Sequence, residues 1–382
     1  MSNGRTLLGS SLLLLAAACG GGKSPTGPGP APSAEASQSI SVVVFYDENG
    51  NGVLDAAEAV RIPDVEVTIG GRAARSAAGT GRAVIAGVAS GSFTPVVNVS
   101  TLPPYYAAGR LPSVTVPLTG DVAVPLVLPI GSNRPNTYMA FGDSLTEGNN
   151  YPGDPSYRGP LQDELRQSFG RADVLNEGVG STKSNQGAER IDGPLLADRP
   201  AYTLVLYGTN DWNQSVCKRP DQLATTCFTI ASLRDIILSA RGASSLPVLA
   251  TIPPCNENFN QFSPPQRNQW VAAANVEIRA LARQQGVVLA DLEPAFLAVP
   301  DLSTLFVDHV HPNARGEQII ADTFTAAILR GRPGATSASA SRQPGAGDPF
   351  LALAGPRRPA ASVGGAGPNG RPGTDRRTVQ SI

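Results

Sequence analysis

The chain has 382 residues, of which 41 are Gly and 34 are Pro, and its formal net charge is −1. This length exceeds that of one ordinary domain. Only 16% of the residues are charged, and the sequence lacks the basic stripe that is typical of nucleic-acid binding, so we expect no nucleic-acid partner.

Residues 1–19 have the composition of an export signal. Arg5 supplies a positive charge, and the apolar run from Leu7 to Ala18 is shorter than the ~20 residues that a membrane-spanning helix needs. Small residues precede Cys19 and glycines follow it, which resembles a bacterial lipoprotein signal, where the cysteine becomes the lipidated N-terminus. The alternative is an ordinary cleaved signal peptide with an incidental cysteine. We expect an exported lipoprotein, periplasmic or at the cell surface, that is anchored to the membrane through Cys19.

Residues 20–38 are rich in Gly, Pro, Ser and Ala and bury too little apolar surface to fold, so they are expected to be a disordered linker. Residues 39–130 contain short β-prone segments with Gly and Pro turns between them. These segments are 40–46, 65–69, 83–86, 93–99 and 122–128. The pattern predicts a small all-β sandwich, followed by a second linker at 131–136.

Residues 137–332 alternate short apolar runs with helical patterns. The strand-like runs are 137–141, 174–175, 202–207, 248–252 and 287–290, and apolar helix faces lie within 161–169, 233–240, 270–281 and 320–328. Such alternation predicts an α/β fold whose parallel sheet is covered by helices on both faces. Residues 333–382 return to Gly, Pro, Ala, Ser and Arg and are expected to be a disordered tail.

Two polar segments of the α/β region supply a nucleophile and a base. Ser144 follows a predicted strand, and open α/β folds bind their ligands at that edge of the sheet. A serine hydroxyl is a weak nucleophile unless a base takes its proton. The chain has only two histidines, and His311 lies three residues after Asp308. We therefore expect His311 to be the base and Asp308 to orient it.

Two further segments supply candidate oxyanion donors. Gly180 lies in a Gly-rich turn after a predicted strand, where a backbone N–H can enter the site without a side chain in the way. Asn210 follows the next strand, and its side-chain amide can donate to an oxyanion.

Together the four segments resemble the SGNH hydrolases, the GDSL-type lipases, esterases and acylhydrolases, over roughly residues 137–330. The resemblance rests on Gly142-Asp143-Ser144-Leu145, Gly208-Thr209-Asn210-Asp211 and Asp308-His309-Val310-His311-Pro312. It implies a three-layer α/β/α, flavodoxin-like sheet and hydrolysis of carboxylic esters by a Ser-His-Asp triad, with no cofactor for catalysis.

The glycine segment departs from the family pattern. Relatives often have two glycines where this chain has Gly180 and then Ser181, so the N–H of either residue could join the Ser144 N–H and the Asn210 amide in the oxyanion hole. His309 with His311 could instead form a metal pair, but no third ligand is apparent. Asp211 is expected to brace the Asn210 turn.

A second resemblance concerns residues 47–58, which fit the twelve-residue calcium-loop pattern. Oxygen-bearing side chains fall at the ligand positions, and glycine falls at the sharp turn. The ligands would be Asp47, Asn49, Asn51, Asp55 and Glu58. A strand precedes the loop, so the region resembles the calcium-binding B-type modules of bacterial adhesins, prealbumin-like sandwiches, rather than an EF-hand. The alternative is a metal-free Asn-Gly turn.

Three cysteines remain outside the signal segment: Cys217, Cys227 and Cys255. In an exported protein two of them could pair, and Cys217 with Cys227 would close a short loop, but spacing leaves the connectivity open.

The sequence favours a monomeric esterase that acts on a lipid or an acylated carbohydrate. The competing hypothesis is a surface adhesion or carbohydrate-binding lipoprotein with a degenerate hydrolase domain.

Overall fold

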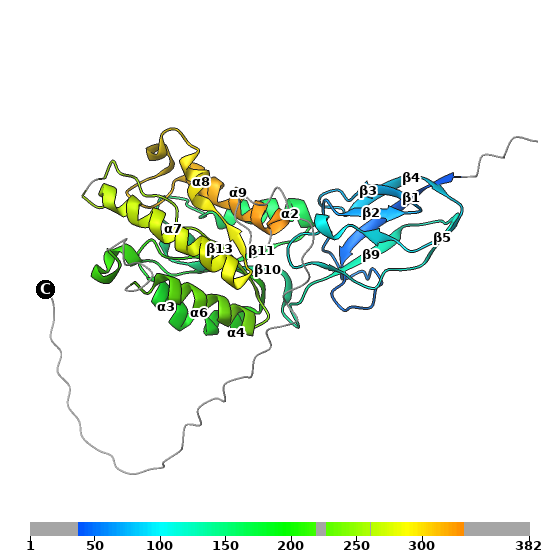
Figure 1. The fold of residues 1–382 in the computed structure, drawn as a ribbon, viewed down its shortest axis with the longest axis horizontal. Helices are drawn as coiled ribbons and strands as arrows, with labels where there is room; N and C mark the ends of the chain where they lie inside the picture. Colours follow the sequence, from blue (N-terminus) through cyan, green and yellow to red (C-terminus); the bar gives the residue numbers. More distant parts are fainter. Residues whose placement is uncertain (1–36, 219–226, 260, 332–382) are drawn as a thin grey trace, which may run out of the picture.

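The computed structural model describes residues 37–218, 227–259 and 261–331. In Figure 1 a strand-rich part at the right meets a larger part in which helices surround a sheet. The expected signal segment, the C-terminal tail and most of the first linker lie outside the described residues. Ser37 and Gln38, at the end of that linker, already belong to the first strand. Within the described ranges, no helix is long and apolar enough to cross a membrane.

The N-terminal part is built from three small sheets. The first has the order β4-β1-β9-β7, with β1 (Ser37–Tyr46), β4 (Arg82–Ala89), β7 (Ala107–Ala108) and β9 (Val122–Val127). The second has the order β3-β2-β6, with β2 (Glu66–Ile69), β3 (Arg72–Arg75) and β6 (Val96–Val97). The third pairs β5 (Gly91–Phe93) with β8 (Val114–Val116), and a 3₁₀ turn, η1, covers Val99–Thr101. The strand-rich prediction agrees with this architecture, although the segment expected at 93–99 is divided among β5, β6 and η1.

The larger part has a five-stranded parallel sheet. Its strands are β10 (Arg134–Gly142), β11 (Asp173–Gly178), β12 (Pro200–Leu206), β13 (Leu246–Ala250) and β14 (Val288–Ala290). They lie in the order β11-β10-β12-β13-β14, and every neighbouring pair is parallel. This is the flavodoxin-like order, in which ligands bind at the carboxyl ends of the strands beside the first strand. The predicted α/β/α fold is therefore confirmed.

Helices cover both faces of this sheet (Figure 1). One layer contains α2 (Arg158–Phe169), α8 (Leu292–Leu297) and α9 (Ala314–Arg330). The other contains α3 (Ser184–Arg190), α4 (Asp192–Asp198), α6 (Thr229–Gly242) and α7 (Pro265–Gln285). The short helix α1 (Ser144–Glu147) follows β10, and 3₁₀ turns cover Asp211–Asn213 (η2), Ser215–Cys217 (η3) and Leu302–Leu305 (η5).

The side chains of β10 alternate between two hydrophobic clusters because successive residues of a strand point to opposite faces. Tyr138 and Ala140 belong to the cluster that includes α2 and α9. Met139 and Phe141 belong to the cluster that includes α6 and α7. All four are fully buried, so β10 lies between two apolar layers and reads as an unbroken apolar run in the sequence.

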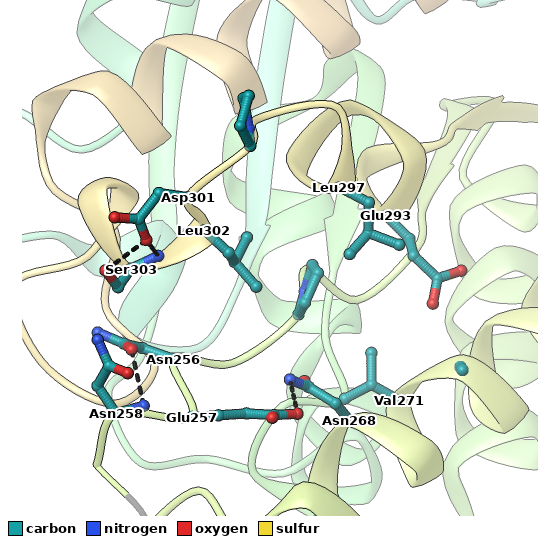
Figure 2. A pocket seen from close by; sticks show the side chains of 13 residues that line it. Asn256, Glu257, Asn258, Asn268, Val271, Glu293, Leu297, Asp301, Leu302 and Ser303 are labelled. Atoms are coloured by element: carbon teal, nitrogen blue, oxygen red, sulfur yellow. Dashed lines mark hydrogen bonds between the residues drawn. The ribbon is translucent and has the colours of Figure 1, made fainter.

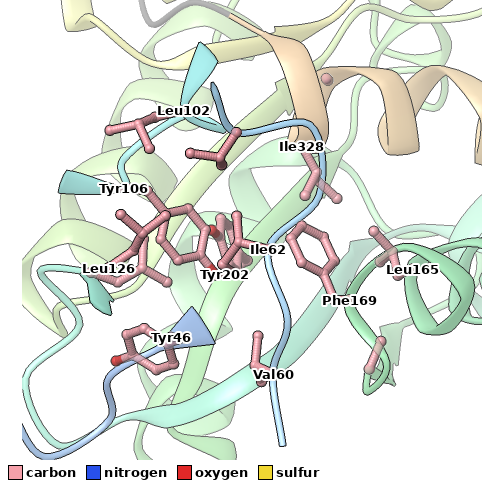
Figure 3. Packing of buried hydrophobic residues seen from close by; sticks show 14 of the residues in the cluster. Tyr46, Val60, Ile62, Leu102, Tyr106, Leu126, Leu165, Phe169, Tyr202 and Ile328 are labelled. Carbon is pink, nitrogen blue, oxygen red and sulfur yellow. The ribbon is translucent and has the colours of Figure 1, made fainter. Parts of the chain in front are cut away.

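The first of these clusters continues into the strand-rich part. Figure 3 shows Tyr46, Ile62 and Leu126 packed near Phe169 and Tyr202 of the α/β part. The hydroxyl of Tyr105 donates to the carbonyl oxygen of Pro247 (2.7 Å) and accepts from the N–H of Val288 (3.1 Å). The two parts therefore share one apolar core.

Backbone hydrogen bonds also join the two parts. The N–H of Arg61 donates to the carbonyl oxygen of Phe169 (2.9 Å), and the N–H of Gly79 donates to that of Ser168 (2.8 Å), at the end of α2. The linker expected at 131–136 is shorter than the sequence indicated, because β10 begins at Arg134, whose N–H donates to the carbonyl oxygen of Arg199 (2.7 Å).

Candidate active site

Ser144 lies at a tight turn between β10 and α1. Gly142 ends the strand at a place where a Cβ atom would come within 2.2 Å of Thr146 Oγ1 and 2.4 Å of the Leu206 carbonyl oxygen. Only glycine fits there without displacing neighbouring atoms. Asp143 caps α1 by accepting from the N–H of Leu145 (3.0 Å), and its burial raises the pKa of its carboxyl to about 7. The turn thus holds Ser144 at the carboxyl edge of the sheet.

His311 and Asp308 approach Ser144 from the loop before α9. The Nε2 atom of His311 lies 2.9 Å from Ser144 Oγ, and its Nδ1 atom lies 2.7 Å from Asp308 Oδ2. Both distances are within hydrogen-bonding range. Ser144 and His311, which are 167 positions apart in the sequence, are therefore in direct contact, and Asp308 completes the order hydroxyl, imidazole, carboxylate.

The loop also fixes the charge of Asp308. Burial alone would raise the pKa of this carboxyl, but hydrogen bonds from the His311 ring and from the backbone N–H groups of His311 and Val310 lower its pKa well below the ordinary value. Asp308 therefore remains a carboxylate at neutral pH and can hold a proton on His311 Nδ1.

His309 lies near the other carboxylate oxygen of Asp308. Its Nδ1 atom is 3.7 Å from Asp308 Oδ1, and its ring packs on Phe262 with centroids 5.2 Å apart. Partial burial lowers the pKa of His309. In the described part of the chain, no three His, Cys, Asp or Glu side chains gather closely enough to hold a metal ion, so the two histidines have no third ligand there.

The turn that contains Gly180 lies beside α1. The N–H of Val179 donates to the carbonyl oxygen of Gly142 (3.0 Å). A Cβ atom on Gly180 would come within 2.5 Å of the Glu147 carboxylate, and Ser181 has a φ of 62°. The chain therefore reverses direction next to the helix that begins at Ser144.

Asn210 and Asp211 follow β12 and have different partners. The Asn210 amide donates to the carbonyl oxygen of Thr182 (3.0 Å), which links the Asn210 turn to the Gly180 turn. Asp211 is fully buried and accepts from the N–H and hydroxyl of Ser184 and from the hydroxyl of Thr229. Asp211 therefore joins the starts of α3 and α6, and nothing places it against Ser144.

Arg190 was not among the residues selected from the sequence. Its Nη2 atom donates to the carbonyl oxygens of Gly142 (3.2 Å) and Glu177 (2.6 Å) and to the hydroxyl of Tyr207 (2.9 Å). Its guanidinium carbon lies 4.2 Å from the centroid of the Phe141 ring. A single cation thus contacts the ends of three adjacent strands. The sequence gives little indication of this role, because α3 has no apolar stripe that would show which of its faces is buried.

A disulfide joins Cys217 to Cys227, across ten positions of sequence, while Cys255 is a buried free thiol. The short loop was one of the pairings that the sequence left open. Residues 219–226, between the two cysteines, lie outside the described residues.

The candidate calcium loop has the expected oxygen atoms, but they are occupied by bonds within the loop. Asp47 accepts from the backbone N–H groups of residues 50, 51 and 52. The amides of Asn49 (2.7 Å) and Asn51 (2.8 Å) donate to Asp55. Glu58 accepts from the N–H groups of residues 48 and 55. The donor set fits calcium by type and order, but the two amides would have to turn away from Asp55 to present their oxygen atoms.

A cavity of about 480 Å³ lies beside the loop that follows β13 (Figure 2). Asn256, Glu257 and Asn268 line its lower side in that view, opposite Asp301 and Leu302. The N–H of Asn256 donates to the carbonyl oxygen of His309 (2.9 Å), so the cavity wall supports the loop of His311. None of the predicted site residues lines it.

A hydrogen-bonded Ser-His-Asp array at the edge of a sheet is the arrangement that serine hydrolases use. Residues 140–319 match the GDSL-like lipase/acylhydrolase family. Residues 140–319 are therefore similar to a GDSL-like lipase/acylhydrolase domain, the resemblance that rests on the three sequence segments.

Individual relatives are distant. An uncharacterized lipoprotein of Bacillus subtilis, YqeF, is 33% identical over 78 residues, which are 19% of this chain and 31% of that protein. The chain therefore spans about a third of that relative.

The solved structures that resemble this chain include two bacterial enzymes. A lipase/acylhydrolase from Enterococcus faecalis is 16% identical, with a TM-score of 0.42, over 53% of this chain and 100% of that one. Axe2, an acetylxylan esterase from Geobacillus stearothermophilus, is 20% identical, with a TM-score of 0.42, over 53% of this chain and 96% of that one.

Proposed function

We propose that the protein hydrolyses carboxylic esters with Ser144 as nucleophile, His311 as general base and Asp308 as its orienting carboxylate. The contact of 2.9 Å between Ser144 Oγ and His311 Nε2 carries this proposal. A hydroxyl in that position can transfer its proton to the imidazole as it attacks a carbonyl carbon. The match of residues 140–319 to the GDSL-like family supports the same reaction class.

The reaction proceeds in two halves. Ser144 Oγ attacks the ester carbonyl, His311 takes the hydroxyl proton, and the tetrahedral intermediate collapses as His311 gives that proton to the leaving alcohol. Water then attacks the acyl-enzyme as His311 takes its proton, and His311 returns that proton to Ser144 Oγ as the acid product leaves. Asp308 stabilises the imidazolium in both halves, because it accepts from Nδ1 at 2.7 Å. No step requires a metal ion or an organic cofactor.

The oxyanion would be held by the Ser144 N–H, the Asn210 amide and a backbone N–H of the Gly180 turn. An amide nitrogen carries two N–H bonds. One Asn210 bond is directed at Thr182, so the other can serve the oxyanion. Gly180 is our choice for the third donor, with Ser181 as the alternative.

The substrate class remains either a lipid ester or an acylated carbohydrate. Hydrolysis of p-nitrophenyl esters of increasing chain length separates the two. A preference for acetyl esters favours a carbohydrate deacylase, and a preference for long chains favours a lipid acylhydrolase.

Alanine substitution tests the reaction itself. Ser144→Ala and His311→Ala should each lose most of the esterase activity, because triad residues act as a unit. His309→Ala is the matched control, since it removes the neighbouring imidazole that does not contact Ser144, and it should retain most activity. Parent and Ser144→Ala proteins of equal activity would disprove the assignment.

A fluorophosphonate probe separates this proposal from its competitor, an adhesion lipoprotein with a degenerate hydrolase domain. The parent should be labelled at Ser144, and Ser144→Ala should not be labelled. A parent that does not react would favour the adhesion hypothesis.

We further propose that the protein is an exported lipoprotein anchored through Cys19. The segment before Cys19 supports this, and so does the name of the B. subtilis relative. Cys19→Ala should release the protein from the membrane fraction, and a parent found wholly in the soluble fraction after export would contradict the anchor.

Calcium is proposed as a structural ligand of residues 47–58. If the site binds calcium, the melting temperature of the full chain should rise in excess calcium. A concentration of a hundred times Kd stabilises the folded state by about 2.7 kcal/mol. Asp47→Ala combined with Glu58→Ala should remove the shift. Removal of calcium should leave ester hydrolysis nearly unchanged. Residues 47–58 belong to the strand-rich part, whereas Ser144 lies at the carboxyl edge of the parallel sheet.

A further inference from the structure

The Asn210 amide is held by a chain of polar groups that begins at Arg190. Arg190 Nη2 donates to the Tyr207 hydroxyl at 2.9 Å, and the Tyr207 hydroxyl lies 3.1 Å from Thr182 Oγ1. The carbonyl oxygen of Thr182 accepts from the Asn210 amide at 3.0 Å. Four residues from α3 and from the loops after β11 and β12 are therefore connected in one series.

The direction of each bond in this chain is fixed by proton count. The Thr182 hydroxyl donates to the carbonyl oxygen of Val179 (2.5 Å), so it can only accept from Tyr207. The Tyr207 hydroxyl therefore donates its single proton to Thr182 and accepts from Arg190, which is always a donor. Burial raises the pKa of Tyr207, so that its hydroxyl keeps this proton at neutral pH.

The Arg190 and Tyr207 members of this hydrogen-bonded series have further contacts that hold them in place. Arg190 also donates to the carbonyl oxygens of Gly142 and Glu177, and its guanidinium lies over the Phe141 ring. The Tyr207 ring is 1% exposed, and a Cβ atom on Gly187 would come within 2.7 Å of it. The aromatic ring is therefore confined between α3 and the sheet, and its hydroxyl has little freedom to move.

We propose that Arg190, Tyr207 and Thr182 are positioning residues that hold the Asn210 amide, and with it the turn of residues 179–182, in the geometry that binds the oxyanion. This inference rests on the proposed function. None of the three contacts Ser144 Oγ in the structure, so their effect passes through Asn210 and through the backbone of the turn. A displacement of about 1 Å in such a group can reduce the rate by 10²-fold.

Tyr207→Phe is the most selective test, because it removes the hydroxyl and leaves the confined ring. We expect kcat to fall about tenfold with KM unchanged, a smaller loss than the 10²–10³-fold that removal of an oxyanion donor typically causes. Thr182→Val should have the same effect, and Thr182→Ser, which keeps the hydroxyl, should restore the rate. Tyr202→Phe is the matched control. It also removes a buried tyrosine hydroxyl, but Tyr202 lies near the start of β12, at the opposite end of the strand from the two turns.

A double-mutant cycle separates positioning from general stability. In an Asn210→Ala background, Tyr207→Phe should change kcat by less than about twofold, because the group that it positions is gone. An equal loss of kcat in both backgrounds, or a loss confined to KM, would overturn the inference.

A spectroscopic readout keeps the test independent of turnover. With ¹⁵N-asparagine labelling, the side-chain amide resonance of Asn210 is assigned by its absence in Asn210→Ala. Tyr207→Phe and Thr182→Val should shift it, whereas Tyr202→Phe should not. An unshifted resonance would overturn the inference even if the protein hydrolysed no ester, and loss of fluorophosphonate labelling in the parent would instead contradict the proposed function.

Discussion

Gly142 is the residue on which the geometry of Ser144 depends most directly. Gly142→Ala places a methyl group within 2.2 Å of the Thr146 side chain and 2.4 Å of the Leu206 carbonyl oxygen. Overpacking of this kind typically costs 1–3 kcal/mol, so we expect a lower melting temperature and a large loss of esterase activity. Gly193→Ala is the control, because nothing lies within 4 Å of the added atom. Equal stability and activity in the two variants would contradict the packing argument.

Three residues of the candidate site were selected from the sequence alone. Ser144, Asp308 and His311 were chosen because a nucleophile needs a base and the chain offers only two histidines. The structure brings these three into contact. Tyr207 and Thr182 could not be found in this way, because their importance depends on which side chains a fold places side by side.

At the scale of elements, the first turn of α9 is linked to the loop between α1 and α2. Tyr151 donates to Glu317 Oε2 at 2.8 Å, and the nearby Asp154 carboxyl hydrogen-bonds with Glu317 as well. Burial and this second carboxyl raise the pKa of Glu317 from 4.5 to about 8. The folded protein therefore keeps Glu317 protonated near neutral pH.

This raised pKa has a defined effect on stability. The folded state holds a proton that the unfolded state releases above pH 4.5, so Glu317 makes the protein less stable as the pH rises towards about 8. Glu317→Gln imitates the protonated form and should weaken this decline. Thermal unfolding of parent and variant between pH 5 and 8 measures the difference, and parallel curves would show that Glu317 ionises freely in the folded state.

Helices and strands were predicted correctly where their burial produces an apolar run or an apolar period in the sequence. The apolar runs of β10, β12 and β13 follow from burial on both faces. α3 was missed because the residues that it buries are Ser184 and Gly187, which give no apolar period. β3 was missed because its four residues are Arg72–Arg75, mostly exposed at a sheet edge. The parallel pairing of β1 with β9 depends on contacts across most of the strand-rich part.

At the scale of the whole molecule, the two parts should unfold together, because they share a core and backbone hydrogen bonds. We expect one calorimetric transition. Tyr105→Phe removes the hydroxyl that bonds Pro247 and Val288, and leaving such buried groups unpaired costs about 1–3 kcal/mol. The variant should melt at a lower temperature, still in one step. Two separate transitions in the parent would mean that the shared core contributes little.

The contacts of Tyr105 also show where Ser144 lies relative to the strand-rich part. Pro247 and Val288 lie at the start of their strands, so the strand-rich part is docked on the edge of the sheet opposite to Ser144, and β1 begins at the outer end of that part (Figure 1). The described part of the chain is therefore elongated, with Ser37 at one end and the edge of the sheet that carries Ser144 towards the other. If the N-terminus is attached to a surface, Ser144 lies at the end of the described part that is farther from the point of attachment. Such a position suits substrates that arrive from the surrounding medium or from a facing surface.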